Sequence, residues 1–399
     1  MEFLNSKCLS VACRLSCLLT AALVVGCASI PPGDKLSGNV KSLDAYEDRG
    51  KIHLLLATAK EGQENAGLIY TCSTDHGKSW KPYHQIDTSA APAFARGRGT
   101  DFQVAAYENQ ILSVWMQHGT GFMGRGPLSS AFSSDGGKSW RNAGNPSDVG
   151  SDGDHAFIDL TADDKGNFHA VWLDKRSGED KGLYSAAYDS RTNKWGKNRT
   201  VDDKVCDCCW NVVKADSSGH LHALYRDKSP RDMGWAFSKD YGKTWESGGP
   251  VGDFDWRIEA CVHVGGGLAI EENDNGTQLH AVVWTANQFN PGLYYVSQKT
   301  KAGNWQEPVR IGGVECTLPD IAVSDSGEIA IAWIQQTAEG NKLFYLKANR
   351  ITSVSTKAVL VHTEEIYPTH PKLLSLGDSL HLFWTGQVGK KDVWRHVKI

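Results

Sequence analysis

The sequence predicts an all-β protein, a β-propeller in which four-stranded antiparallel blades repeat along the chain. Two recurring phrases carry the prediction. One is a turn with the pattern S-x-D-x-G-K-[S/T]-W, and the other is an apolar strand that often contains His and ends in Trp. The strand phrase occurs seven times, so we predict seven blades.

The turn phrase occurs three times with every fixed position kept, at Ser73–Trp80, Ser133–Trp140 and Ser238–Trp245. Short strand-like runs flank each copy, which is typical of a β-hairpin. An Asp in such a turn accepts hydrogen bonds from its own backbone, and Gly supplies a positive φ. We therefore interpret Asp75, Asp135 and Asp240 as turn residues and not as catalytic acids.

The strand phrase sets the length of the repeat. Its aligned positions are 53, 112, 169, 222, 280, 330 and 381, which lie 50 to 59 residues apart. A unit of this length holds four strands, with the phrase as the second and the turn after the third. We interpret the histidines at 53, 169, 222, 280 and 381 as packing or turn-bonding residues. The chain ends before the seventh unit gains a fourth strand, so we expect the segment 36–41 to supply it.

The N-terminal segment is typical of a secretory signal. Lys7 and Arg14 precede an apolar run that ends just before Cys27, and this run is too short to span a membrane. It resembles a bacterial lipoprotein signal, which implies a palmitate-bearing lipid on Cys27 and an exported protein at the outer membrane or periplasmic side. An ordinary signal peptide with a chance cysteine is the alternative. We predict a signal peptide at 1–26, a lipidated tether at 27–38 and one propeller domain at 39–399.

The amino-acid composition limits the kinds of binding partner that we expect. The chain has 22% charged and 40% hydrophobic residues and a net charge of -4. These values suit one closed domain, and without a basic field we expect no nucleic-acid partner. We expect a monomer whose partners are the membrane, through its lipid, and a glycan or protein ligand.

The turn phrase resembles the Asp-box (BNR repeat) of sialidases and related propellers. The segments around His155, Cys206–Cys209, Arg231–Met233 and Cys261–Gly267 are similar to a branch of bacterial exported sialidase-like proteins. The resemblance implies a ligand site at the channel and allows exo-α-sialidase activity. Sialidases have six blades, so six is the alternative to our count of seven.

The working face of a propeller is expected where the chain enters the first strand of each blade. Five cysteines lie on such entry segments. Cys206, Cys208, Cys209 and Cys261, with His263, have the ligand chemistry of a Cu(I) or Zn(II) site. The alternative is that the cysteines form disulfides, which an exported protein allows, or are inert thiols.

Charged residues lie on the same face. The expected ligand-binding set is Arg98, His155, Arg176, Arg226, Arg231, Asp232 and Arg257. Sialidases hold a substrate carboxylate with three arginines, and Asp101, Asp154 and Glu259 are the carboxylates placed to act as catalysts. No Tyr nucleophile is identified. The alternatives are salt-bridged loops and noncatalytic binding of an anion or glycan.

We therefore expect a lipid-anchored, sialidase-like propeller that binds a glycan, a protein partner or a metal at its channel face. The alternative functions are a sialidase-type glycoside hydrolase and a copper- or zinc-binding surface protein.

Overall fold

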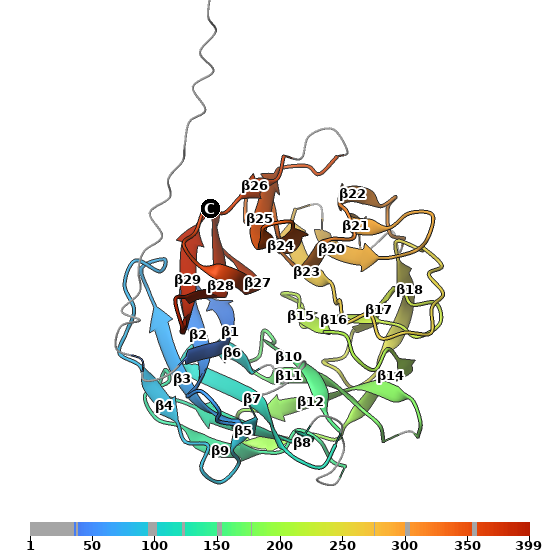
Figure 1. Cartoon of the computed structure of the whole chain (residues 1–399). Helices are drawn as coiled ribbons and strands as arrows, with labels where there is room; N and C mark the ends of the chain where they lie inside the picture. The colour runs from blue at the N-terminus through green and yellow to red at the C-terminus, as the bar shows by residue number, and fades with distance from the viewer. Residues whose placement is uncertain are drawn as a thin grey trace, which may run out of the picture.

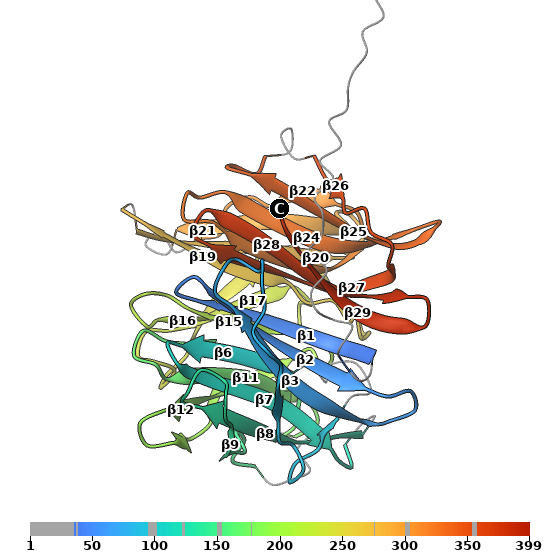
Figure 2. The same cartoon turned by 90° about the vertical axis from the view of Figure 1, so that its left-hand side faces the viewer.

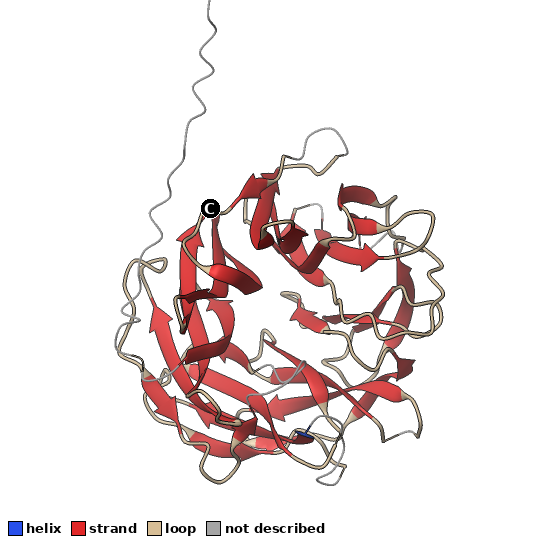
Figure 3. Ribbon diagram, viewed as in Figure 1, coloured by secondary structure: helices blue, strands red, loops and turns tan. Residues whose placement is uncertain are grey.

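The structure is a computed structural model that describes Leu36 and residues 39–94, 102–121, 124–149, 154–176, 178–274, 276–299, 304–352 and 357–399. The expected signal peptide and the lipidation site Cys27 lie outside these residues. Strands account for almost all of the regular structure in these ranges (Figure 3). No helix among them is long and apolar enough to cross a membrane.

The strands form antiparallel sheets that follow one another along the chain. The first sheet contains β1 (Asn39–Asp48), β2 (Lys51–Ala59), β3 (Asn65–Ser73), β4 (His84–Ile86), β5 (Ala93–Phe94), β6 (Gln103–Tyr107), β7 (Gln110–His118), β8 (Arg125–Ser133) and β9 (Arg141–Gly144). Only the short β5 joins β3 to β7, so this sheet consists of two four-stranded parts, β1 to β4 and β6 to β9.

The remaining sheets have three to five strands each. They are β10 (Ala156–Ala162), β11 (Phe168–Asp174), β12 (Lys181–Asp189), β13 (Lys194–Trp195) and β14 (Arg199–Val205); β15 (Val212–Ala215), β16 (Leu221–Arg226), β17 (Met233–Ser238) and β18 (Glu246–Val251); β19 (Gly267–Asn273), β20 (Gly276–Thr285), β21 (Gly292–Lys299) and β22 (Val309–Gly312); β23 (Cys316–Val323), β24 (Ile329–Thr337), β25 (Gly340–Ala348) and β26 (Val359–Leu360); and β27 (Ile366–Leu376), β28 (Ser379–Val388) and β29 (Lys391–Lys398).

The seven copies of the strand phrase are all strands, namely β2, β7, β11, β16, β20, β24 and β28. Each one pairs with the strand before it and the strand after it. The histidines of this phrase are buried, and His53 and His280 each hydrogen-bond a Tyr hydroxyl through Nδ1 at 2.7 Å. Their interpretation as packing residues is confirmed.

The sheets lie around a centre in Figure 1, with β1, β6, β10, β15, β23 and β27 nearest to it. The first strand of each four-stranded unit contacts the first strand of the next, and β27 contacts β1. In the view turned by 90°, the sheets of the N-terminal half lie below those of the C-terminal half (Figure 2).

The expectation that the segment 36–41 supplies a fourth strand to the last sheet is wrong for its described residues, Leu36 and Asn39–Lys41. Asn39–Lys41 begins β1, which pairs with β2 along its whole length. The segment still lies beside the last sheet, because Lys41 Nζ donates to Asp392 Oδ2 at 2.5 Å and the Asp392 amide donates to Asn39 Oδ1 at 3.2 Å. β1 is the end strand of its sheet and pairs only with β2, and the hydrogen bonds to β29 use the side chains of Lys41 and Asn39, so they form no strand pairing.

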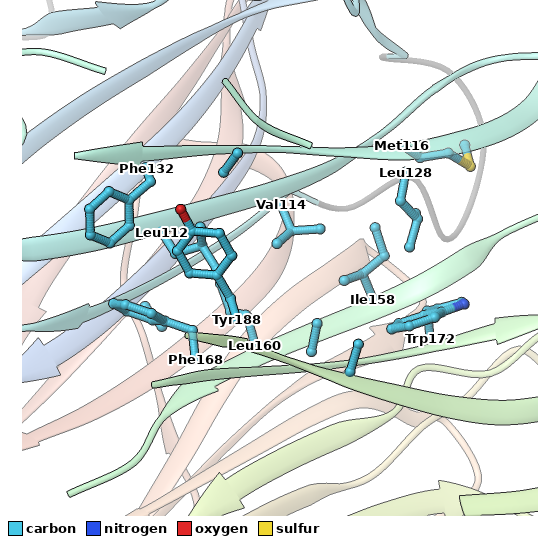
Figure 4. Close-up of a cluster of buried hydrophobic side chains, with 14 of the residues drawn as sticks. Leu112, Val114, Met116, Leu128, Phe132, Ile158, Leu160, Phe168, Trp172 and Tyr188 are labelled. Carbon is cyan, nitrogen blue, oxygen red and sulfur yellow. The ribbon is translucent and has the colours of Figure 1, made fainter. Parts of the chain in front are cut away.

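Apolar side chains fill the space between neighbouring sheets. Figure 4 shows one such cluster, in which Leu112, Val114 and Phe132 from β7 and β8 face residues of β10 to β12. The facing side chains are Ile158, Leu160, Phe168, Trp172 and Tyr188. A similar cluster joins β1 and β2 to β27, β28 and β29, so the first and last sheets pack through an apolar interface.

The three copies of the turn phrase have the predicted geometry. Asp135 accepts hydrogen bonds from the Ser139 amide at 2.9 Å and the Ser139 hydroxyl at 2.6 Å, and Ser133 Oγ donates to it at 2.8 Å. Gly137 has φ = 86° and its amide donates to Ser133 Oγ. Hydrogen bonds led by that of the Ser139 hydroxyl lower the pKa of Asp135 to about 2. The other two copies repeat these contacts, so their Asp residues have a local structural role.

Candidate functional site

A cavity lies at the centre of the sheets, where the chain enters the first strands. Its volume is about 140 Å³. Its lining comes from the start of β6, the residues just before β15 and β19, and the early residues of β23 and β27. Since β1 and β3 run in the same direction, the turns after β3, β8 and β17 lie at the opposite end. The cavity is therefore on the face that the sequence predicts to be the working one.

Three aspartates at equivalent positions of β1, β10 and β23 form the floor of this cavity. Each carboxylate accepts a hydrogen bond from a backbone amide in the first strand of the next unit. The bonds are Val104 N to Asp44 Oδ2 at 2.9 Å, Val213 N to Asp159 Oδ2 at 2.7 Å, and Leu373 N to Asp320 Oδ2 at 2.7 Å. These bonds join neighbouring sheets at the centre, where the first strands make no ladder with one another.

Two lysines compensate the three carboxylates. Lys372 Nζ lies 2.9 Å from Asp44 Oδ1, and Lys214 lines the same cavity. Burial raises the pKa of Asp159 and Asp320, although both lysines act against this rise. Burial alone would lower the pKa of Lys372, but the three carboxylates together raise it. The floor is thus a compact, partly compensated charge network with one more acid than base.

The upper part of the cavity is less charged. Trp210 and Asn211 lie on one side and His370 and Pro371 on another. Gln103 is 8% exposed, and its Oε1 is buried with no hydrogen-bond partner within the described ranges. An amide oxygen in this state favours a donor from a bound ligand or water.

A cluster of thiols lies beside the cavity, in the loop between β14 and β15. Cys206 Sγ is 3.6 Å from Cys208 Sγ and 3.5 Å from Cys209 Sγ, and all three sulfurs lie within 4.8 Å of one another. The three side chains are buried. The six cysteines in the described ranges are all free thiols, so the disulfide alternative is not realised there.

Positive charge and an apolar shell surround the thiols. Arg231 Nη1 donates to Cys206 Sγ at 3.0 Å. Hydrogen bonds from Cys208 and Cys209, with the charge of Arg231, lower the pKa of Cys206. The hydrogen bond to Cys206 raises the pKa of Cys208, and burial raises that of Cys209. The guanidinium of Arg231 thus favours a thiolate at Cys206.

Two residues expected in the metal site do not join the sulfur cluster. Cys261 is exposed, and it is not a member of the group whose ligand atoms all lie within 4.8 Å of one another. His263 Nδ1 faces the Cys208 carbonyl oxygen at 3.2 Å, which makes it a donor to the backbone of the loop. The thiols that the sequence singles out thus come together as three, without a fourth ligand among the described residues.

Most of the expected ligand-binding arginines bond within the protein. Arg226 donates to the carbonyl oxygens of Val264, Arg231 and Trp284 and is 1% exposed. Arg176 pairs with Asp174 through Nη2 at 2.5 Å and with an exposed carboxylate through Nη1 at 2.8 Å. The Arg176 contacts are the salt-bridged loops that the sequence left open as an alternative, whereas Arg226 bonds backbone carbonyls.

Arg231 and Asp232, in the loop between β16 and β17, bond residues of the loop between β18 and β19. Arg231 Nε donates to the Ile258 carbonyl at 3.0 Å, and Asp232 accepts the amides of Asp255 and Trp256 at 2.8 and 3.1 Å. Arg257 is exposed and its Nη2 lies 2.6 Å from Asp255 Oδ1.

His155 is fully buried. Its Nδ1 donates to the Gly126 carbonyl at 3.1 Å, so its Nε2 accepts from Ser147 Oγ at 2.8 Å. Burial, above all, lowers the pKa of His155. With both ring nitrogens bonded internally, this histidine is held as a neutral structural group.

The catalytic candidates do not converge in the described part of the chain. Asp154 Oδ2 lies 3.1 Å from Lys181 Nζ, and its Oδ1 is buried without a hydrogen bond there. Glu259 is exposed on the loop before β19. Arg98 and Asp101 lie outside the described residues. None of the described residues that line the cavity is a tyrosine.

The floor aspartates are residues of the candidate site that sequence reasoning missed. A signal was present, because Leu43-Asp44-Ala45, Ile158-Asp159-Leu160 and Pro319-Asp320-Ile321 repeat one pattern at the same place of three repeats. A charged residue between apolar ones in a central strand is costly unless it is bonded. The pattern therefore indicates that each Asp has a buried partner of the same kind. In the structure, this partner is a backbone amide in the first strand of the next unit.

A scan against protein-family models and a search of curated protein sequences each gave no match. Among solved structures, a protein of unknown function from Dyadobacter fermentans superposes with a TM-score of 0.53 and 13% identity, covering 90% of this chain and 94% of that one. Polysaccharide lyase Uly1 gives 0.52 and 13%, covering 90% and 89%. Phage phi92 endosialidase gives 0.51 and 10%, covering 90% and 67%. At these identities the similarity shows a shared all-β fold and no more.

Proposed function

We propose that this chain is an exported, lipid-anchored β-propeller of seven blades that binds a hydroxyl-rich carbohydrate at the mouth of its central channel. The circuit of contacts from β1 through β27 and back to β1 supports the ring. The repeated turn supports its relation to Asp-box propellers. Two of the proteins that share the fold are named for carbohydrate chemistry, a polysaccharide lyase and an endosialidase.

The observation that carries the proposal is the cavity with the buried amide oxygen of Gln103 in its wall. Ligand sites are typically concave, with a few polar groups that point inward. A sugar hydroxyl donates readily to an amide oxygen, and the indole of Trp210 offers an apolar surface for a sugar ring. The lining of the cavity thus combines a polar floor with an aromatic side.

The charges favour a neutral sugar over a carboxylate-bearing one. The described floor has three acids and two lysines, and Lys372 is already paired with Asp44. A sialic acid carboxylate requires free guanidinium groups, whereas Arg176, Arg226 and Arg231 all bond internally. We therefore propose binding without sialidase-type hydrolysis.

The test is binding of the purified chain to an array that carries neutral oligosaccharides, an arabinan and 3′-sialyllactose. We expect a neutral glycan to bind, and Gln103→Leu to weaken its binding at least about tenfold, which corresponds to about 1.4 kcal/mol. Gln85→Leu, on the exposed strand β4, is the matched control and should bind normally. Equal binding by both variants, or no bound glycan, would contradict the proposal.

Two further assays separate the alternatives. Release of fluorophore from a fluorogenic sialoside by the unmodified chain would favour the hydrolase instead. For the anchor, we expect Cys27→Ser to prevent incorporation of labelled palmitate and to release the chain from the membrane fraction. Unchanged labelling of that variant would refute the proposed lipidation site.

A further inference from the structure

We infer that Cys206, Cys208 and Cys209 form a binding site for a single soft metal ion, and that this ion is Cu(I). The inference concerns a different site from the carbohydrate cavity and does not depend on it. Its basis is the convergence of three buried sulfurs in one short loop.

The distances between the three sulfurs are suitable for one metal ion bound by all of them. With metal–sulfur bonds of about 2.3 Å, three sulfurs in a trigonal plane lie about 4 Å apart. The observed separations are 3.6 Å for Cys206 to Cys208 and 3.5 Å for Cys206 to Cys209, and all pairs are within 4.8 Å. An S–S bond is only about 2.05 Å long, so the sulfurs are too far apart to be bonded and close enough to share an ion.

The number of ligands distinguishes copper from zinc. Structural Zn(II) sites are almost always tetrahedral with four protein ligands. In the described part of the chain, no His, Asp or Glu donor atom joins the three sulfurs. Thiolates are ligands of both ions, but Cu(I) is satisfied by three sulfur donors and needs no fourth. The buried position of the thiols also leaves little room for a water to complete a zinc site.

The surroundings are suited to a charged metal–thiolate centre. Three thiolates with Cu(I) carry a net charge of about -2, since each thiolate must lose its proton to bind. Arg231 Nη1 lies 3.0 Å from Cys206 Sγ and offsets part of this charge. His263 donates to the Cys208 carbonyl and fixes the loop that holds the sulfurs. Phe157, Val205 and Tyr225 belong to the apolar cluster that encloses them.

The backbone of the loop is held on both sides of the site. The Cys206 amide donates to the Arg226 carbonyl at 2.9 Å, and Asn211 Nδ2 donates to the Phe157 carbonyl at 2.9 Å. The sulfurs are therefore presented by a loop with fixed ends, which limits the reorganisation that metal binding requires.

The experiment uses the full-length chain, extracted in detergent and purified without oxygen. It is loaded with Cu(I) and washed with a Cu(I) chelator of known affinity. We expect about one copper per chain by elemental analysis, and X-ray absorption should show sulfur neighbours at about 2.3 Å. Cys208→Ser should lower the affinity for Cu(I) at least tenfold. Cys261→Ser, which removes an exposed thiol outside the cluster, is the matched control and should retain the copper.

Several results would overturn the inference. They are a folded chain that retains no copper, equal copper loss in both variants, and a stoichiometric Zn(II) that Cu(I) does not displace. Mass spectrometry that finds Cys206 or Cys209 in an intact disulfide of the exported protein would do the same. The X-ray absorption measurement needs no substitution, so it decides the question even if Cys208→Ser fails to fold.

Discussion

Replacing Lys372 by Met tests whether the central charges hold the sheets together. Lys372 Nζ is 2.9 Å from Asp44 Oδ1, and Asp159 and Asp320 also raise the pKa of this lysine. Methionine keeps most of the side-chain volume and removes the charge. Each of the three carboxylates is bonded to the next first strand, and among the described residues that line the cavity they would then keep only Lys214 as a lysine neighbour.

The expected loss of stability follows from the burial of the pair. Removing one partner of a buried ion pair costs about 3–5 kcal/mol, because the other charge stays buried and uncompensated. The side chain of Lys372 is 24% exposed and that of Asp44 is 6% exposed. Since the lysine has some access to water, we expect the lower end of this range, about 3 kcal/mol.

The pH dependence has a definite sign. Burial raises the pKa of Asp159 and Asp320 above their unfolded value. A carboxyl with a raised folded pKa contributes stability that is fully present below the unfolded pKa and is lost as the pH rises through the folded pKa. Removing Lys372 raises both pKa values further. The stability deficit of the variant should therefore grow from about pH 4 towards neutral pH.

The assay is equilibrium denaturation in urea at about pH 5 and about pH 8, with refolding checked at each pH. Lys390→Met, at an exposed turn, is the matched control and should change stability by less than about 0.5 kcal/mol. Asp44→Asn combined with Lys372→Met should cost less than the sum of the two single changes, because the residues are in contact. A Lys372→Met variant with the same midpoint as the unmodified chain, or with a deficit that does not vary with pH, would refute the reasoning.

Three further predictions concern the turns and the arginines. Gly137→Ala should destabilise the chain by more than about 2 kcal/mol, because its Cβ would lie 2.0 Å from a tyrosine ring. Gly50→Ala meets no atom within 4 Å, so it should cost only about 1–2 kcal/mol, the cost of a positive φ in a non-glycine residue. Equal shifts of the melting temperature in the two variants would contradict this. Arg226→Met leaves three buried carbonyls unbonded and should cost about 3 kcal/mol, while the exposed Arg257→Ala should stay within about 0.5 kcal/mol in the same denaturation assay. Asp135→Ala should lower the free energy of unfolding by about 1 kcal/mol near neutral pH without changing glycan binding. The lowered pKa of this carboxyl means that its stabilising effect is lost on protonation. The difference in stability should therefore vanish as the pH falls from about 4 to about 2.

The strands and turns could be predicted from the sequence because their signals are local. The apolar run around His53 and its counterparts marks a strand wherever it is placed, and Asp135 with Gly137 defines a turn through contacts within eight residues. The place of the segment 36–41 could not be predicted in this way. Its described residues lie beside both the first and the last sheet, and Asn39–Lys41 pairs through its backbone with β2 but contacts β29 only through side chains.

The membership of the candidate sites depends on where loops run, which spacing does not fix. Cys206, Cys208 and Cys209 come together because one turn holds them, whereas Cys261 belongs to a loop that is exposed. Arg226 carries the same formal charge as Arg257, yet one side chain points into three carbonyls and the other into solvent. The charge of a residue predicts a need for partners, and only the fold determines whether a ligand or the backbone provides them.

The floor of the cavity would couple the stability of the protein to the ligand binding that we propose. Asp44, Asp159 and Asp320 each use one carboxylate oxygen to bond the neighbouring sheet, so only the other oxygen is left for Lys372 or a ligand. A substitution here therefore changes the junction between sheets and the shape of the cavity together. Gln103 differs, because its Oε1 bonds no other described residue. Loss of binding in Gln103→Leu is consequently the result that can be assigned to ligand contact, whereas loss of binding in any floor variant must first be corrected for the unfolded fraction.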